Sequence, residues 1–251
     1  LAAKTFTRAT GIKVAITRKG TGEALALIRA EAANPKGDIW WGGTGDPYIQ
    51  AAEEGLLQAY ASPRHADLHP WAIRQLELTR GQSVGIYSGA IVFGYNTELL
   101  RKKKLPVPAC WSDLVKPAYR GEIESSHPAS SGTAYTIIAT LVQLMGENKA
   151  FAYMRELHRN VTQYTKSGNA QAQSVGRGEA TIGISWEFGF VAEAARGFPI
   201  ELRHPCEGTG YEVGAMAIIK GARNLDAARR WYDWALSPEA QAQGPQVGSL
   251  Q

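Results

Sequence analysis

The clearest hydrophobic pattern in the chain follows a run of small polar residues near its middle. Residues 127–134 (HPASSGTA) lead into apolar positions that recur at helical spacing, which predicts a helix. Ser130, Ser131 and Thr133 are candidate N-cap residues for it, and Gly132 allows a backbone or a ligand to approach closely. The apolar positions of this helix are Tyr135, Ile137, Ile138, Leu141, Leu144 and Met145.

The start of this predicted helix has two possible uses. A helix start leaves backbone N–H groups unpaired and carries partial positive charge, so it suits an anion. The hydroxyl groups before it are also ordinary capping residues, and capping alone would explain them. The pattern by itself leaves both uses open.

The N-terminal part of the chain alternates apolar runs, polar loops and amphipathic helices. Residues 12–17 alternate and predict a strand, and residues 38–41 (DIWW) predict a short buried strand that the loop 42–47 ends. The order of strand, glycine-containing loop and helix is typical of a parallel α/β sheet, in which ligands lie beyond the carboxyl ends of the strands. Neither the loop 20–22 nor the loop 42–47 matches a nucleotide-binding motif.

The rest of the chain continues this alternation. Asn96 and Asn224 are candidate caps of two further helices, and the polar loop 165–169 precedes another helix with Ala172 and Val175 on its inner side. Residues 186–189 follow directly on a predicted strand. Further strands are predicted at 84–87, 90–95, 181–185, 200–203 and 211–219.

Composition narrows the class of protein. The 251 residues are 44% apolar and 20% charged, which is typical of one large globular domain or two ordinary ones. No apolar run is long enough to span a bilayer. The net charge is +4, and the basic residues are scattered apart from 101–104, so we expect no nucleic-acid partner.

The residues that carry chemistry give little support for an enzyme. His127 with Ser130 or Ser131 invites a hydrolase interpretation, but the chain has no GxSxG motif and no sign of an orienting acid. None of the five histidines lies in a metal-binding motif. The two cysteines, Cys110 and Cys206, lack zinc spacing and are too few for a disulfide scaffold. We therefore expect no catalytic residue, no cofactor and no metal ligand.

Six short motifs, in order, resemble a known family. They are 38–43 (DIWWGG), 91–96 (IVFGYN), 111–114 (WSDL), 129–133 (ASSGT), 177–180 (RGEA) and 207–211 (EGTGY). Each is weak alone, but their order and spacing resemble the bacterial periplasmic solute-binding proteins of ABC transporters. The resemblance is strongest to the branch for ferric iron, phosphonates or sugar phosphates, and it runs from about residue 5 to the C-terminal end.

The resemblance implies an α/β fold of two lobes with a ligand cleft between them, the type II periplasmic-binding-protein fold. Lobe one would be 1–88 with 214–251, lobe two 94–212, and the hinge strands would lie near 89–96 and 211–219. It also implies a monomer that is exported to the periplasm through a removed signal peptide and docks onto an ABC permease. The family's first strand would precede residue 1, and some sequence would follow the last residue.

The family model brings three loops to one cleft, each before a helix. It therefore implies a ligand shell of N–H groups and hydroxyls, which suits a small phosphorylated, phosphonate or carboxylate metabolite. The residues of this shell are Gly43, Thr44, Ser130, Ser131, Gly132, Thr133, Ser167 and Gly168.

Five further residues have open roles under the resemblance. Trp186 would stack on the ligand or close the core, and Glu187 would accept from ligand hydroxyls or an amine, or be solvated. Glu207 would bond the ligand or brace the hinge. Cys110 follows the first hinge strand and Cys206 precedes the second, so the periplasm would permit a disulfide, which sequence alone leaves open.

A ferric-iron or iron-chelate binder of the same fold is the alternative. Iron binders in this family carry two adjacent tyrosines near the second hinge, and this chain has no such pair. Relatives that bind phosphorylated sugars often carry His-Asp after the strand that ends near 186, where this chain has Phe188 and Gly189. The resemblance therefore does not name the solute.

Overall fold

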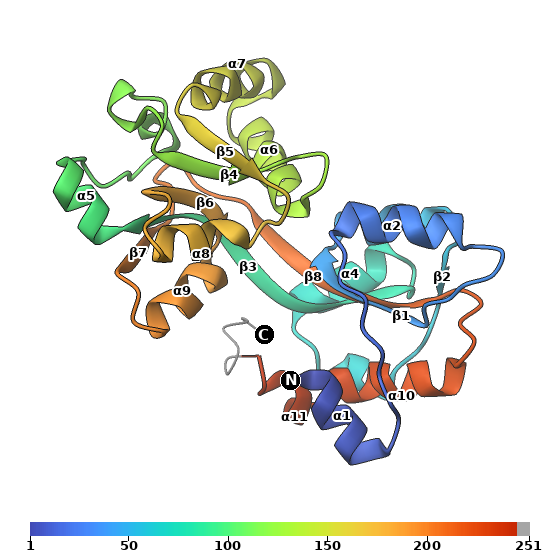
Figure 1. The fold of residues 1–251 in the computed structure, drawn as a ribbon. Coiled ribbons are helices and arrows are strands. Elements are labelled where there is room, and N and C mark those ends of the chain that lie inside the picture. The colour runs from blue at the N-terminus through green and yellow to red at the C-terminus, as the bar shows by residue number, and fades with distance from the viewer. Residues whose placement is uncertain (245–251) are drawn as a thin grey trace. The chain divides into compact units, whose positions relative to one another are not determined.

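The computed structural model describes residues 1–244, and Figure 1 shows its helices and strands. The chain divides into two compact units, Leu1–Ser88 with Val213–Gln251 (unit 1) and Gly89–Glu212 (unit 2). Two strands, β3 (Ser83–Asn96) and β8 (Tyr211–Ile219), carry the chain from one unit to the other. No helix of the described residues is long and apolar enough to cross a membrane.

Unit 1 is built on the second part of β8, which pairs antiparallel with β1 and with β2. The parallel sheet predicted for this part of the chain is therefore wrong here. The sequence order of strand, loop and helix does not by itself determine strand direction. The elements of unit 1, besides parts of β3 and β8, are α1 (Ala2–Thr10), α2 (Thr21–Ala30), β1 (Ile39–Thr44), α3 (Asp46–Glu53), β2 (Leu57–Gln58), a 3₁₀ helix (Pro63–Asp67), α4 (Pro70–Leu78), α10 (Leu225–Ala235) and α11 (Pro238–Gln241).

Both faces of β8 are covered in unit 1. Met216 and Ile218 face one core with α1 and α10, in which Phe6 packs edge-to-face on Trp231 at 5.0 Å between ring centroids. The alternate residues Ala215 and Ala217 face a second core with α2 and α3. Because successive strand residues point to opposite faces, a strand that is apolar at every position lies between two helical layers.

Three predicted boundaries in the first 96 residues differ from the structure. Residues 12–17 form no strand, because the segment has no ladder partner, and Ile16 is 65% exposed. The predicted loop at Gly42–Thr44 belongs to β1, whose register shifts where Gly42 and Gly43 have φ of 79° and 85°. Glycine reaches these angles at no steric cost, so the strand continues through the irregularity. The two strands predicted at 84–87 and 90–95 are one strand, β3.

Unit 2 contains the parallel strands. The strand β4 pairs parallel with β5 and β6, whereas β6 and β7 pair antiparallel with β3. The elements of unit 2, besides parts of β3 and β8, are α5 (Thr97–Lys103), two 3₁₀ helices (Trp111–Asp113 and Pro117–Tyr119), β4 (Ile123–Ser126), α6 (Gly132–Met145), α7 (Glu147–His158), β5 (Val161–Thr165), α8 (Ala170–Gly176), β6 (Ile182–Trp186), α9 (Glu187–Ala195) and β7 (Ile200–Arg203).

Helices cover both faces of the sheet in unit 2 (Figure 1). On one face, Ile137 and Leu141 of α6 pack with Ile184 of β6. On the other face, α8 and α9 contribute apolar side chains that include Val175 and Phe190. The predicted cap at the start of α5 is confirmed, since the Asn96 side chain accepts from the N–H groups of residues 98 and 99. This layering leaves the carboxyl ends of β4, β5 and β6 at one edge.

Candidate functional site

Three parallel strands of unit 2 end at the same edge of the sheet. β4 ends at Ser126, β5 at Thr165 and β6 at Trp186. The segments that follow are 127–131, which leads into α6, and 166–169, which leads into α8, while α9 follows β6 directly. The segments that the sequence singles out around Ser130 and Ser167 are therefore neighbours.

Hydrogen bonds fasten these two loops to each other. The His127 N–H donates to the Thr165 carbonyl at 2.8 Å, and the Ser130 hydroxyl donates to the Lys166 carbonyl at 3.1 Å. On β6, the Ser185 hydroxyl donates to the Gly168 carbonyl. The edge is thus a connected set of backbone and hydroxyl groups from three strands.

Gly168 brings its loop against the start of α6. A Cβ atom built on Gly168 would lie 1.8 Å from the Thr133 Oγ1 and 3.1 Å from the Ser131 Oγ. No side chain fits at such a distance, so the contact requires glycine. Three of the predicted shell residues, Ser131, Thr133 and Gly168, are therefore in one place.

The hydroxyl groups before α6 do not cap it. Ser131 occupies the N-cap position, but its side chain makes no cap hydrogen bond. The Ser130 hydroxyl donates to carbonyls, and the Thr133 Oγ1 accepts from the Trp186 indole N–H at 2.7 Å. The alternative in which these hydroxyls serve only as caps is therefore wrong, and the first N–H groups of α6 have no carbonyl partner within the helix.

Trp186 closes the core rather than offering a free ring face. It is 3% exposed and packs among the apolar side chains of α6 and β6, with its ring parallel to that of Phe188 at 6.5 Å. The core-closing alternative is the one that the structure has, and stacking on a ligand is not available in this arrangement. The indole N–H instead reaches the edge of the sheet through Thr133.

Glu187 pairs with a residue that the sequence analysis missed. Its Oε2 lies 3.0 Å from the His204 Nε2, and its Oε1 accepts from the Ala90 N–H at 3.4 Å. The carboxylate is therefore held at the edge and is not simply solvated. No sequence signal links the two residues, because their contact depends on how α9 is placed against the segment after β7.

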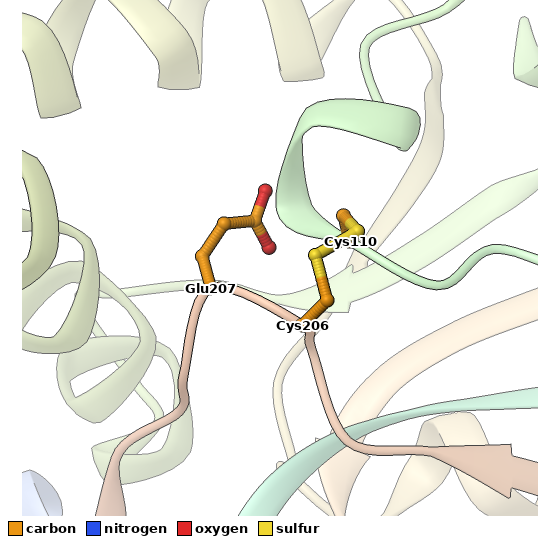
Figure 2. A group of neighbouring side chains, drawn as sticks. All are labelled: Cys110, Cys206 and Glu207. Atoms are coloured by element: carbon orange, nitrogen blue, oxygen red, sulfur yellow. A yellow bond between two sulfur atoms is a disulfide. The ribbon is translucent and has the colours of Figure 1, made fainter.

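Glu207 and the two cysteines form a separate cluster in unit 2. Cys110 and Cys206 are joined by a disulfide, with their Cα atoms 4.7 Å apart. Figure 2 shows the Glu207 side chain directed toward the turn that carries Cys110. Its carboxylate accepts from the N–H groups of Trp111 at 2.7 Å and Ser112 at 3.0 Å. Glu207 therefore braces this turn, and its oxygens are engaged away from the edge of β4, β5 and β6.

The electrostatics of Glu207 follow from these bonds. Burial by itself raises the pKa of the carboxyl, but the Ser112 and Trp111 N–H groups outweigh burial and hold the pKa below its ordinary value. The two sulfurs and the carboxylate lie within 4.8 Å of one another. Metal binding needs free thiolates, and the disulfide removes them.

The predicted shell residues of unit 1 lie at the end of β1. The Gly43 N–H donates to the Tyr87 hydroxyl at 2.8 Å, so it is not a free donor, contrary to the prediction. A Cβ on Gly43 would lie 2.4 Å from the Thr21 Oγ1, at the first turn of α2. Thr44 is buried opposite Gly214. Thr21 and Tyr87 are further polar residues of this part that sequence analysis missed, since neither lies in a recognisable motif.

The comparisons with known proteins decide the family. A family model described as bacterial extracellular solute-binding protein matches residues 44–248. The chain belongs to this family. The resemblance predicted from the six motifs is confirmed, and the protein is a periplasmic solute-binding protein of ABC transport and not an enzyme.

Individual relatives support this assignment. An uncharacterized protein of Haemophilus influenzae is 48% identical over 240 residues, which cover 95% of this chain and 69% of that protein. The solved structure of the periplasmic binding protein AfuA from Actinobacillus pleuropneumoniae, with exogenous fructose-6-phosphate bound, is 44% identical with a TM-score of 0.93. It covers 99% of this chain and 79% of that chain. A putative 2-aminoethylphosphonate-binding periplasmic protein of Salmonella paratyphi A is 25% identical over 244 residues, 94% of this chain and 68% of that protein.

The solute-binding protein thus has a mixed α/β periplasmic-binding-protein fold. Its unit 2 brings together the predicted residues Ser130, Ser131, Thr133, Ser167 and Gly168 at one edge of a sheet. Its Glu207 lies with the disulfide instead, and its Gly43 and Thr44 belong to unit 1.

Proposed function

We propose that this solute-binding protein captures a small organic anion, a phosphorylated, phosphonate or carboxylate metabolite, and delivers it to an ABC permease. The observation that carries the proposal is the hydrogen bond from the Trp186 indole to the Thr133 hydroxyl. An indole N–H can only donate, so the Thr133 oxygen acts as the acceptor in this bond. The hydroxyl proton of Thr133 is then left to donate.

The surroundings of Thr133 favour an acceptor-rich ligand. Among residues 1–244, the Thr133 hydroxyl donates no hydrogen bond, and it lies in the first turn of a helix of 14 residues. The unpaired N–H groups of such a turn lie at the helix N-terminus, where the helix carries its partial positive charge. Hydrogen bonds to a charged acceptor contribute about 1.5–3 kcal/mol each, so a few of them offset the cost of removing an anion from water.

The hydrogen-bonded pair of Glu187 and His204 beside the edge supports a ligand that carries more than an anionic group. Glu187 accepts hydrogen bonds and repels a second negative charge, while His204 keeps the carboxylate in position. Together they favour a solute with hydroxyl or amine donors away from its anionic end. Fructose-6-phosphate and 2-aminoethylphosphonate, named for two of the relatives, both have this character.

The two compact units supply the means of capture in this proposal. We assign unit 1 and unit 2 as the two lobes, with hinge strands near 89–96 and 211–219. The solute would contact the start of α6 in unit 2. A ligand that touches both lobes only in the closed state favours that state. The protein would act as a monomer and present the closed form to the permease.

Ferric iron is the weaker candidate. Iron needs hard anionic ligands, and the chain has no adjacent pair of tyrosines to supply phenolates. The His-Asp pair of some sugar-phosphate binders is also absent, since Phe188 and Gly189 stand there.

Titration calorimetry with the purified protein tests the proposal. The panel contains sugar phosphates, phosphonates, carboxylates, neutral sugars and ferric citrate. We expect binding of at least one anion, and Thr133→Val should weaken it by about 10- to 100-fold, because one charge-assisted hydrogen bond is lost. Thr136→Val is the matched control. Thr136 lies one turn after Gly132 in α6, and its hydroxyl already donates to the Gly132 carbonyl, so it has no proton left for a ligand. Tight binding of a neutral sugar or of iron without any anion would overturn the proposal.

A further inference from the structure

The interior of unit 2 contains an unusual polar layer beneath α8. Glu124 and Ser126 of β4 are 4% and 1% exposed, and Gln171 and Ser174 of α8 are 0% and 8% exposed. Residues two apart on a strand share a face, and residues three apart on a helix lie on the same side. A buried carboxyl, a buried amide and two buried hydroxyls therefore come from only two elements.

The register places these four side chains opposite one another. Ser126 pairs with Thr165 of β5, and the Gln171 Nε2 donates to the Thr165 Oγ1 at 2.8 Å, so Gln171 lies over this end of the strand. Glu124 lies one step back along β4, where burial raises the pKa of its carboxyl and a hydrogen bond with Ser174 works against that rise. The helix α8 thus places Gln171 near Ser126 and Ser174 near Glu124, so it covers β4 with polar groups at both of these positions.

Three oxygens of this layer have no hydrogen-bond partner within the described residues, although all three are buried. They are the Glu124 Oε1, the Ser126 Oγ and the Gln171 Oε1. The Glu124 and Gln171 oxygens are acceptors, so without an added proton they cannot pair with each other. A buried acceptor without a partner is costly, and native proteins rarely leave one so.

The Glu124 carboxylate also has no counter-charge in direct contact within the part of the chain that is described, although Arg177 is near enough to lower its pKa. It forms no salt bridge there, and the nearby Arg177 binds the exposed Glu179 instead, at 2.8 Å and 2.9 Å. A buried charge in a protein is paired, protonated or bound to a metal ion. The missing partner of this layer is therefore either a proton on Glu124 or a cation.

We propose that the Glu124 Oε1, the Ser126 Oγ and the Gln171 Oε1 bind a small monovalent cation of the sodium class. An all-oxygen set suits hard cations and disfavours the transition metals that prefer nitrogen or sulfur. A single carboxylate is neutralised by a single positive charge. One such ion supplies the counter-charge and satisfies all three oxygens at once.

The position of the cation couples it to the edge of the sheet. Ser126 is the last residue of β4, and Gln171 follows the loop 166–169 within the first turn of α8. The cation therefore ties the base of that loop to the strand. We expect sodium to stabilise unit 2 whether or not the solute is an anion. The test of the cation site is therefore independent of the test of the proposed function.

Thermal unfolding at constant ionic strength tests the site. The protein is compared at pH 7.5 in sodium chloride and in choline chloride, without any solute. At a sodium concentration about 100 times the dissociation constant, we expect the unfolding midpoint to rise by about 5 °C. Glu124→Gln keeps the shape and removes the charge, so it should abolish the rise. Glu179→Gln, at the exposed carboxylate beside Arg177, should keep it.

Sodium-23 NMR on the unmodified protein gives an independent result that does not depend on a variant. A bound, slowly tumbling ion broadens the sodium line, and potassium or lithium should compete for it. Equal midpoints in sodium and choline, no excess broadening, or a full sodium response in Glu124→Gln would each overturn the proposal. Any of these results would mean that Glu124 carries a proton or that water fills the layer.

Discussion

The buried strands β8 in unit 1 and β4 in unit 2 show how differently two strands of one chain are used. From Ala215 to Ile219, β8 is apolar at every position, and it contributes side chains to two hydrophobic cores. β4 begins with the apolar Ile123 and continues as Glu-Ser-Ser, although it is equally buried. The first strand stabilises the fold. The second strand, β4, buries polar side chains in place of apolar ones, and these polar groups lie beneath the candidate site.

Stability and ligand binding therefore depend on different strands of the molecule. Substitutions in β8 should lower the free energy of unfolding and leave ligand affinity unchanged. Substitutions at the edge of β4, β5 and β6 should lower ligand affinity more than they lower the free energy of unfolding.

The largest effect is expected in β8. Ile218→Ala removes a fully buried side chain between β3 and α10, so the free energy of unfolding should fall by about 3 kcal/mol. Denaturant unfolding measures this loss, and calorimetry on the folded variant should give an unchanged dissociation constant. A large change in affinity with little loss of stability would contradict the division between the two strands.

The next effect concerns the contact between the loop and α6. Gly168→Ala places a Cβ where the Thr133 Oγ1 now lies, so loop and helix start must separate. We expect about a 100-fold loss of affinity, the equivalent of about 2.7 kcal/mol, from two or more lost hydrogen bonds. Gly22→Ala in α2, where the added Cβ meets nothing within 4 Å, is the control and should bind normally. Equal affinities of the two variants would remove Gly168 from the site.

A smaller loss is expected when the indole donor is removed. Trp186→Phe retains an aromatic ring but frees the Thr133 hydroxyl to rotate, so affinity should fall about 10-fold. Trp111→Phe is the matched control, because its indole donates to the Gly208 carbonyl at 3.0 Å in the same unit. It should reduce stability without reducing affinity. If both variants bind equally well, Trp186 has no role in orienting Thr133.

The smallest effect concerns Glu207, whose folded pKa lies below its ordinary value. Such an acid stabilises the fold above the unfolded pKa of about 4.3 and loses that contribution as pH falls through its folded pKa. Solvent screening limits the effect, so Glu207→Gln should cost about 1 kcal/mol at pH 7 and nothing near pH 2. Unfolding curves of both proteins across pH check this. A difference that grows toward acid would have the wrong sign.

The fold was predictable where periodicity determines burial. The strand runs that became β3, β6, β7 and β8 and the helix that became α6 carry apolar residues at regular spacing. Strand direction was not predictable, because periodicity reports which side is buried and says nothing of the partner. Residues 12–17 show the same limit, since they alternate correctly but meet no neighbouring strand.

The site was predictable in part for the same reason. The hydroxyl and glycine residues of 130–133 and 167–168 stand out because turn residues mark the ends of strands. The links from Trp186 to Thr133 and from Glu187 to His204 join residues 53 and 17 apart in sequence. They depend on the register of the sheet and the placement of α9, which no local pattern encodes.

The disulfide has a topological consequence. Cys110 and Cys206 are 96 positions apart, so they close a covalent ring that contains β4, β5, β6 and the loops between them. Every candidate residue of unit 2 except Glu207 lies on this ring. A protease that cuts the chain once within the ring therefore releases no fragment until the disulfide is reduced. During synthesis, the ring cannot close until residue 206 has been made, after all strands of the candidate site.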